Sequence, residues 1–135
     1  MSNSFLIADR GLGEARLLLE SSIERDGVIH KVSVLPLENA VLALFYEGPI
    51  KIGTLAVSTP GLREGGAGTS SVLLGGKYMI AARALAERVA ASYNRMSIIS
   101  INTGLSEGEA LRLYVSLLDK ARSEGSGKNS SGSRD

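Results

Sequence analysis

Strand-forming segments fill the first half of this chain, and helical periodicity begins only after residue 77. Four segments rich in aliphatic and β-branched residues follow one another: residues 17–24, 28–35, 40–46 and 50–58. Asp26-Gly27 separates the first two and is a strong hairpin signal, because glycine accepts the positive φ that tight turns need. Connections this short join antiparallel neighbours. The sequence therefore predicts an antiparallel β meander.

The second half of the chain alternates between strand-like and helical patterns. Residues 71–74 are a short apolar run and a possible fifth strand, and residues 96–101 form another strand. Between them, residues 77–94 place apolar side chains along one side of a helix: Ile80, Ala84, Leu85, Val89 and Tyr93. Ser106 and Glu109 form a capping box that starts a second helix, which we expect to end near residues 124–125.

Strands mostly precede helices in this order, β-β-β-β-(β)-α-β-α, which indicates the α+β class. We expect an antiparallel meander of about five to six strands with two helices on one face. A chain of 135 residues forms one domain. We place this domain at residues 17–124, after an N-terminal arm (1–16) and before a disordered tail (125–135) of Ser, Gly and charged residues.

The predicted sheet has more apolar surface than two helices can cover. An antiparallel sheet with one exposed face alternates apolar and polar residues. Residues 41–45 do not alternate, and neither do Ile98 and Ile99. In residues 28–35 one side carries valines, and the other still carries Ile29 and Leu35. Five strands about 4.8 Å apart and about 17 Å long present a face on the order of 400 Å², near the upper limit for monomers.

We therefore expect a second copy or a homologous partner to stack on this second face, with the helices outside. The predicted dimer face contains six residues: Ile29, Ser33, Leu35, Leu55, Val57 and Ile99. The alternative is that residues 5–16 fold across the same face. The first interpretation predicts a dimer and the second a monomer.

Composition argues against several classes of partner. The net charge is +1, from 15 basic and 14 acidic residues without a basic stripe, so we expect no nucleic-acid binding. The chain has no cysteine, and therefore no disulfide or thiolate site. No run approaches the roughly 18–20 apolar residues of a membrane span, and the N-terminus lacks the basic region of a signal peptide. We expect a cytoplasmic protein that does not bind membranes.

Three motif-like patterns do not predict catalysis. Residues 11–13 (GLG) open like a dinucleotide-binding fingerprint, but Arg16 occupies the third glycine position. Residues 75–77 (GGK) resemble the end of a phosphate-binding loop, yet Tyr78 stands where Ser or Thr should ligate magnesium. His30 is the only histidine, and the sequence identifies no carboxylate partner for it. We predict no catalytic residue, no cofactor and no metal.

The glycine-rich segment at residues 60–70 is the one long connection without periodicity. Loops of this length in compact domains are often functional. We expect a partner to contact charged residues of this loop and of the helix that follows it: Arg63, Glu64, Arg83, Glu87 and Arg88. The alternative is a flexible connection with no role in binding.

Residues 52–58 (IGTLAVS) and 69–75 (TSSVLLG) resemble the proteasome assembly chaperone 3 family, as do the following helix, the strand at 97–101 and the closing helix at 108–118. The related chaperone 4 shares the segment around residues 71–75 and the helix and strand after it. The resemblance spans residues 17–122 in element order, and its specific part is the Gly-Thr-Leu strand and the Val-Leu-Leu-Gly turn.

This resemblance implies a sheet with two helices that forms a homodimer, or a heterodimer with a chaperone 4-like partner. It also implies binding to proteasome α subunits, which promotes assembly of the α ring without nucleotide or metal. Residues 60–69 and the first 16 residues match nothing in the family pattern. The C-terminal Ser-Arg-Asp lacks the hydrophobic-Tyr-X ending by which other proteasome chaperones dock, so we expect no docking through an inserted tail.

Two other functions remain open. A dimeric scaffold of the roadblock type also combines a sheet with two helices, but places a helix before its first strand, which residues 11–20 could supply. An enzyme with a small-molecule pocket between helices and sheet is less favoured, because no acid–base pair and no nucleophile with a partner can be named.

Overall fold

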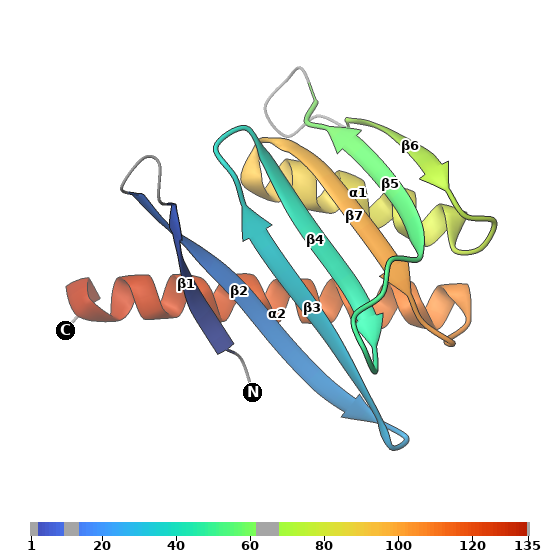
Figure 1. Cartoon of the computed structure of the whole chain (residues 1–135), viewed down its shortest axis with the longest axis horizontal. Coiled ribbons are helices and arrows are strands. Elements are labelled where there is room, and N and C mark those ends of the chain that lie inside the picture. The colour runs from blue at the N-terminus through green and yellow to red at the C-terminus, as the bar shows by residue number, and fades with distance from the viewer. Residues whose placement is uncertain (1–2, 10–13, 62–67, 135) are drawn as a thin grey trace.

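A computed structural model describes residues 3–9, 14–61 and 68–134, with side chains for residues 18–61 and 68–124. It contains one mixed β-sheet with both helices on the same face (Figure 1). The described strands are β1 (Asn3–Asp9), β2 (Glu14–Arg25), β3 (Val28–Pro36), β4 (Ala40–Glu47), β5 (Thr54–Thr59), β6 (Thr69–Leu74) and β7 (Met96–Asn102). The helices are α1 (Met79–Tyr93) and α2 (Glu107–Arg134). The predicted α+β class is confirmed.

The strand order is β1-β2-β3-β4-β7-β5-β6, so the sheet is not a simple meander. The antiparallel run from β2 to β4 is as predicted, and Asp26 (φ 54°) and Gly27 (φ 81°) form its first turn. However, β7 inserts between β4 and β5 and pairs in parallel with β4, so the expected β4–β5 neighbour pair is wrong. Both sides of β7 are largely apolar or small, which suits an interior strand buried between two others.

The N-terminal segment adds to the edge of the sheet. Strand β1 pairs antiparallel with β2, from Asn3 opposite Glu20 to Asp9 opposite Glu14. The alternative that residues 5–16 lie across the second face is therefore wrong for the described residues of this segment. A strand at the edge satisfies its backbone hydrogen bonds through its neighbour, which a segment laid across a face cannot do.

The core lies between the sheet and the two helices. Alternate strand residues point to the helices: Val32, Val34, Val41, Ala43, Phe45, Ala56, Ile99 and Ile101. Helix α2 contributes Leu113, Tyr114, Leu117 and Leu118, all at most 2% exposed. Aliphatic residues and one Phe–Tyr pair fill this layer, with the rings of Phe45 and Tyr114 5.4 Å apart.

The predicted apolar stripe of α1 is only partly correct. Leu85 and Val89 are buried and Tyr93 packs against the core, whereas Ile80 is 71% exposed. The other buried positions of this helix are alanines: Ala81, Ala82, Ala86 and Ala90. Small side chains let the helix backbone approach the sheet closely. The alanine side of α1 therefore faces the sheet, and Ile80 faces solvent.

Helix α2 continues to Arg134, so its predicted end near residues 124–125 is wrong. The backbone of residues 125–134, predicted as a disordered tail, is helical. Once a helix is nucleated, each further residue forms one more backbone hydrogen bond at little cost, so a packed helix extends readily beyond its last contact.

The starts of the two helices are capped by Ser106, just before α2, and by Glu107, its first residue. Ser106 Oγ accepts the Glu109 N–H at 3.4 Å, which is one of the two bonds of the predicted capping box; the Glu109 carboxylate instead accepts the Ser106 hydroxyl at 3.0 Å. Glu107 instead caps α1, because its Oε2 accepts the N–H groups of Ile80 (2.7 Å) and Ala81 (2.8 Å). A carboxylate there offsets the positive end of the helix dipole.

Gly53 lies in the connection from β4 to β5, where the chain passes close to β7. Its N–H donates to Ser100 Oγ at 2.9 Å, and a Cβ at this position would overlap the carbonyl oxygen of Ile101. We expect Gly53→Ala to lower the free energy of unfolding by about 1–3 kcal/mol, because the backbone must shift to relieve the overlap. Urea denaturation followed by circular dichroism measures this change.

Gly76→Ala is the matched control, since an added Cβ at Gly76 meets no atom within 4 Å. Its free energy of unfolding should stay within about 0.5 kcal/mol of the unsubstituted protein. Equal losses in the two variants would contradict the close approach at Gly53.

Candidate protein-interaction surface

The side of the sheet opposite the helices is covered by no helix among the described residues (Figure 1). We call this side the open face. Alternation and cross-strand pairing assign the following residues to it: Glu20, Ser22, Glu24, Ile29, Lys31, Ser33, Leu35, Ala40, Leu42, Leu44, Tyr46, Leu55, Val57, Thr59, Thr69, Ser71, Met96, Ile98, Ser100 and Asn102. The side chains in the middle of this face are mostly aliphatic, although a face that stays in water normally carries polar residues.

Cross-strand pairing joins the apolar residues of the open face into a continuous row. Leu35 lies opposite Leu42, Leu42 opposite Ile98, and Ile98 opposite Val57. A second row places Leu44 and Leu55 on either side of Ser100. Side chains directly opposite on neighbouring strands contact one another. The open face therefore has an apolar centre that crosses β3, β4, β7 and β5.

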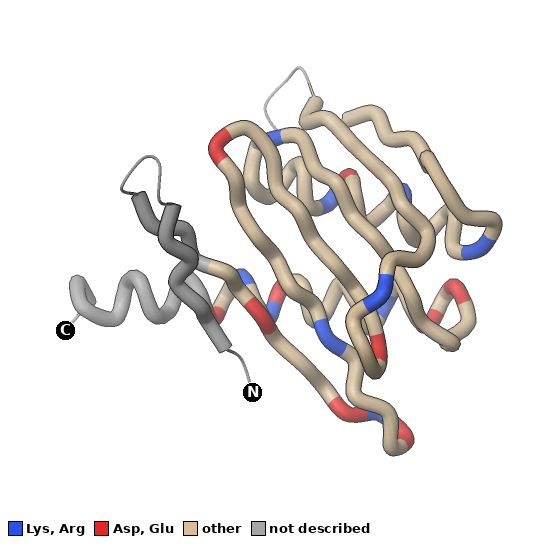
Figure 2. Tube along the Cα trace, in the orientation of Figure 1, with Lys and Arg blue, Asp and Glu red and all other residues tan. Residues whose placement is uncertain are grey.

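Charged residues lie around this centre and not within it. Figure 2 shows charges at turns, on the helices and within β2 and β3, and none in the middle of β4, β5 and β7. Strands β5, β6 and β7 contain no charged residue, and β4 carries only Glu47 at its end. On the side of the centre next to β2, Ser33 Oγ donates to the Glu20 carboxylate at 3.0 Å and lies 3.3 Å from the Tyr46 hydroxyl. The arrangement is an uncharged centre with a polar rim, typical of protein interfaces.

The structure brings together five of the six residues predicted for the dimer face. Four are clearly at the surface or half-buried on the open face, namely Ile29, Leu35, Leu55 and Val57, and Ser33 lies there under the Tyr46 hydroxyl. The prediction for Ile99 is wrong, since Ile99 is fully buried beneath the helices. Its neighbour Ile98 lies on the open face. Adjacent residues of a strand point to opposite faces, so one of the two isoleucines faces the helices and the other the open face. The register of β7 with β4 determines which one does which.

The residues predicted to bind a partner outside the sheet fall into two groups. Arg63 and Glu64 lie outside the described residues. The other three lie on α1, on the helix side of the molecule: Arg83 donates to Ser70 Oγ at 3.1 Å, and Ser70 also donates to the Glu87 carboxylate. Arg88 forms an ion pair with Asp119 at 2.9 Å. These contacts tie α1 to β6 and α2, so they explain the charges of α1 without a partner.

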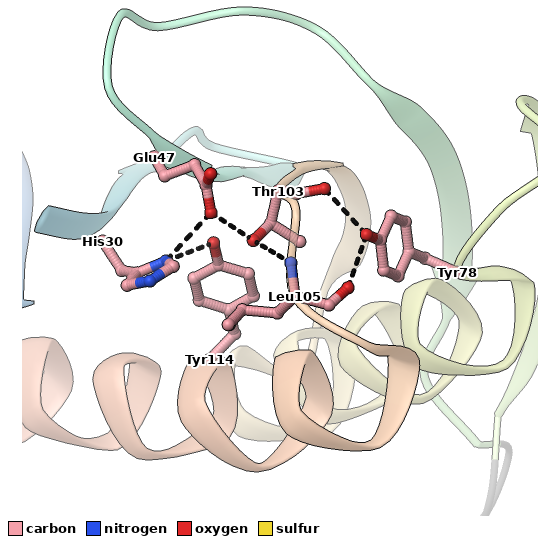
Figure 3. Close-up of polar contacts among 6 residues, drawn as sticks. All are labelled: His30, Glu47, Tyr78, Thr103, Leu105 and Tyr114. Atoms are coloured by element: carbon pink, nitrogen blue, oxygen red, sulfur yellow. Dashed lines mark hydrogen bonds and ion pairs between the residues drawn. The ribbon is translucent and has the colours of Figure 1, made fainter. Parts of the chain in front are cut away.

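A buried polar cluster lies on the other side of the sheet, where β3 and β4 meet the start of α2 (Figure 3). His30, which is 1% exposed, has Nδ1 3.0 Å from the Tyr114 hydroxyl and 3.6 Å from Glu47 Oε2. Thr103 Oγ1 donates to Glu47 Oε2 at 2.6 Å. The Tyr78 hydroxyl lies 2.7 Å and 2.6 Å from the carbonyl oxygens of Thr103 and Leu105. The cluster joins the β7–α2 connection to β3, β4 and α1.

Burial and hydrogen bonding shift the pKa values in this cluster. Burial lowers the pKa of His30, the nearby Glu47 carboxylate opposes this shift, and Arg25 adds to it. The Thr103 hydrogen bond lowers the pKa of Glu47. Burial raises the pKa of Tyr114 to about 12. His30 is therefore a neutral, packed side chain near neutral pH, which favours a structural role for the only histidine.

We expect the protein to lose stability as the pH falls below the ordinary His pKa of 6.5. The His30 pKa is lower in the folded state, so the unfolded state binds more protons in this range and the free energy of unfolding rises with pH. Stability from this source is complete above 6.5 and decreases towards the folded pKa. Glu47 acts in the same direction below its ordinary value of 4.5. Urea unfolding at several pH values between about 7.5 and 5.5 measures the slope.

His30→Gln is the control for this prediction, because it removes the only imidazole while keeping a polar side chain. Its free energy of unfolding should depend much less on pH over the same range. An unsubstituted protein that gains stability as the pH falls would contradict the buried, neutral histidine.

Further observations on the described residues concern a small pocket, metal binding and membrane-spanning helices. A hollow of about 200 Å³ lies along β5 and β6, lined by Val57, Met96 and Ser and Thr side chains, without a titratable group. It does not lie between the helices and the sheet. Within residues 3–9, 14–61 and 68–134, no three His, Asp or Glu side chains are grouped to hold a metal ion, and no helix is long and apolar enough to cross a membrane.

Comparison of the sequence with models of protein families and with curated proteins found no match.

Proposed function

We propose that this chain is a dimeric protein-binding protein that acts as a proteasome assembly chaperone in the cytoplasm. It binds proteasome α subunits and promotes assembly of the α ring, without a cofactor. The observation that carries the proposal is the apolar centre of the open face, which no described helix covers. A surface of this kind marks a protein-interaction site in a chain whose own helices cover only the opposite face.

A second copy, or a homologous partner, fits the open face best. Sheets that pack face to face lie about 10 Å apart with their strands about 30° from parallel, and their side chains interdigitate. The row from Leu35 to Val57 is aliphatic and uncharged, so two copies related by a two-fold axis bring no like charges together at the centre. Helices α1 and α2 then lie on the outside of the dimer, with the ion pair between Arg88 and Asp119 in solvent.

The proteasome assignment is supported by the resemblance of two sequence segments to the chaperone 3 family. The segment 52–58 corresponds to β5 and its approach, and the segment 69–75 to β6 and the turn after it. The order of α1, β7 and α2 after them agrees with the order that the resemblance implies. These segments form the end of the sheet farthest from β1, so the proteasome assignment depends on that end.

The roadblock-type alternative is less well supported. It needs a helix before the first strand, and residues 11–20 were the candidate. From residue 14 these residues belong to strand β2, and residues 3–9 also form a strand. The described part of the N-terminal segment therefore favours the chaperone proposal.

Two measurements test the proposal. Sedimentation velocity should give a dimer at micromolar concentration. Tagged protein expressed in its own cells should co-purify with at least one proteasome α subunit, and the open-face variant Ile98→Glu should reduce the recovery if dimerisation is needed for binding. A protein that is dimeric but binds no α subunit of its own cell would overturn the proteasome assignment and leave the dimer in place.

A further inference from the structure

We propose that the free edge of β6 binds an extended, acidic segment of a partner protein by strand addition. Strand β6 is the last strand of the sheet and pairs only with β5, so one row of its backbone N–H and C=O groups has no partner strand among the described residues. This inference does not depend on the open-face dimer, because it concerns the edge of the sheet and not its face.

The edge carries little of the usual protection against pairing. Natural edge strands are shielded by charged side chains, prolines, β-bulges or covering segments, and β6 has only a register shift between its pairs with Ala56 and Leu55. The sequence of β6, Thr-Ser-Ser-Val-Leu-Leu, contains no charge and no proline, and four of its six residues are exposed. An incoming strand can therefore form a ladder along residues 69–72, before the register shift, as in other peptide-binding sheets.

A cluster of exposed apolar side chains surrounds one end of this edge. We call it the corner patch, and it consists of Ile52, Leu73, Leu74, Met79 and Ile80, with exposed fractions from 49% to 71%. The start of β5, the end of β6 and the start of α1 meet there (Figure 1). Leu74 pairs with Leu55, and Thr54 Oγ1 donates to the carbonyl oxygen of Lys77 at 2.6 Å, which holds the three elements together. Apolar side chains of an added strand would find their contacts here.

The charges at the corner patch indicate the chemistry of the partner. Lys51 and Lys77 flank the patch and are exposed, and neither forms an ion pair among the described residues. The nearby carboxylate of Glu107 is already bound to the first N–H groups of α1. An extended segment with apolar residues and at least one carboxylate therefore complements the site.

A second copy of the chain fits this edge less well. Its own β6 is uncharged and brings the same lysines, so it offers no carboxylate to Lys51 or Lys77. If copies also pair through the open face, pairing through β6 as well would link dimers into open chains. The occupant is therefore a different protein.

Selection from a library of random peptides about 12 residues long, displayed on phage, tests the proposal. We expect the enriched peptides to combine alternating apolar residues with Asp or Glu. A synthetic peptide of the enriched sequence should slow hydrogen exchange of the β6 amides, and its dissociation constant should rise at least about 10-fold for Leu74→Glu. Lys77→Glu should weaken the same peptide, whereas the matched charge reversal Lys31→Glu on the open face should not.

No enrichment above an empty surface, or a bound peptide that protects other amides and leaves β6 unchanged, would overturn the proposal. So would enriched peptides without carboxylates that bind Lys77→Glu as well as the unsubstituted protein. The two surfaces can be tested separately: Ile98→Glu should still bind the peptide, and Ile80→Glu, in the corner patch on the helix side, should weaken the peptide and still dimerise. An unsubstituted protein that is a monomer but still binds the peptide would contradict only the proposed function.

Discussion

Ile98→Glu will convert the proposed dimer into a monomer. Ile98 lies at the centre of the open face, between Leu42 and Val57, and a two-fold axis brings both copies of it into the interface. Each substitution replaces an apolar contact by a carboxylate without a partner, and residues at the centre of an interface carry most of its energy. We expect the dissociation constant of the dimer to rise at least about 100-fold, about 2.8 kcal/mol. Sedimentation velocity over a range of concentrations measures it.

Ile80→Glu is the matched control for this substitution. Ile80 is 71% exposed on α1, on the helix side of the molecule, so the same exchange there should leave the dimer intact. Circular dichroism should give the same spectrum for both variants. If the unsubstituted protein is a monomer at the highest concentration tested, or if Ile98→Glu stays dimeric, the open face is not the dimer interface.

Tyr114→Ala should cause the largest loss of stability of any substitution considered. Tyr114 is fully buried, packs on Phe45 and lies 3.0 Å from His30 Nδ1. Removing a buried aromatic ring costs about 3–5 kcal/mol, which is a large share of the about 5–15 kcal/mol that stabilises a typical domain. Equilibrium unfolding in urea, followed by circular dichroism, measures the loss.

Tyr114→Phe separates the ring from the hydroxyl. It keeps the packing on Phe45 but removes the hydrogen-bond partner of a histidine that is 1% exposed. The expected loss is about 1–3 kcal/mol, the cost of leaving one buried polar group unsatisfied. If Tyr114→Phe is as stable as the unsubstituted protein, the polar cluster adds little to stability and the ring alone accounts for the effect.

The sequence predicted features that depend on neighbouring residues. Asp26-Gly27 places the first hairpin because its residues accept positive φ, and Ser106 with Glu109 places the start of α2. Helix α1 was expected at residues 77–94 and spans Met79–Tyr93. Each of these signals acts within a few residues, so no knowledge of the rest of the fold is needed.

Strand order and facing could not be predicted in the same way. The position of β7 between β4 and β5 depends on which distant strands pair, and a local pattern does not contain that information. The exchange of Ile98 and Ile99 has the same origin, because a shift of one residue in register moves a side chain to the other face. The capping of α1 by Glu107 also joins residues far apart in the sequence.

The sequence therefore predicted that an apolar interaction surface exists, but only some of the residues that form it. An excess of apolar residues over what two helices can cover is a property of composition, and it needs no strand order. The identity of the central residues needs the register. Leu42 and Leu44 belong to a run of residues that does not alternate, so the sequence offered no reason to assign either of them to one face.

The position of β7 between β4 and β5 has a consequence for synthesis on the ribosome. The hairpins from β1 to β4 and the pair β5–β6 can form as they emerge, but β7 alone joins these two halves and is made after both. Until β7 is made, the edge of β4 that pairs with it has no partner strand in the growing chain. Long-range pairing of this kind slows folding and exposes unpaired edges to association with other chains. Until β7 is made and pairs with β4 and β5, the nascent protein is therefore open to association with other chains.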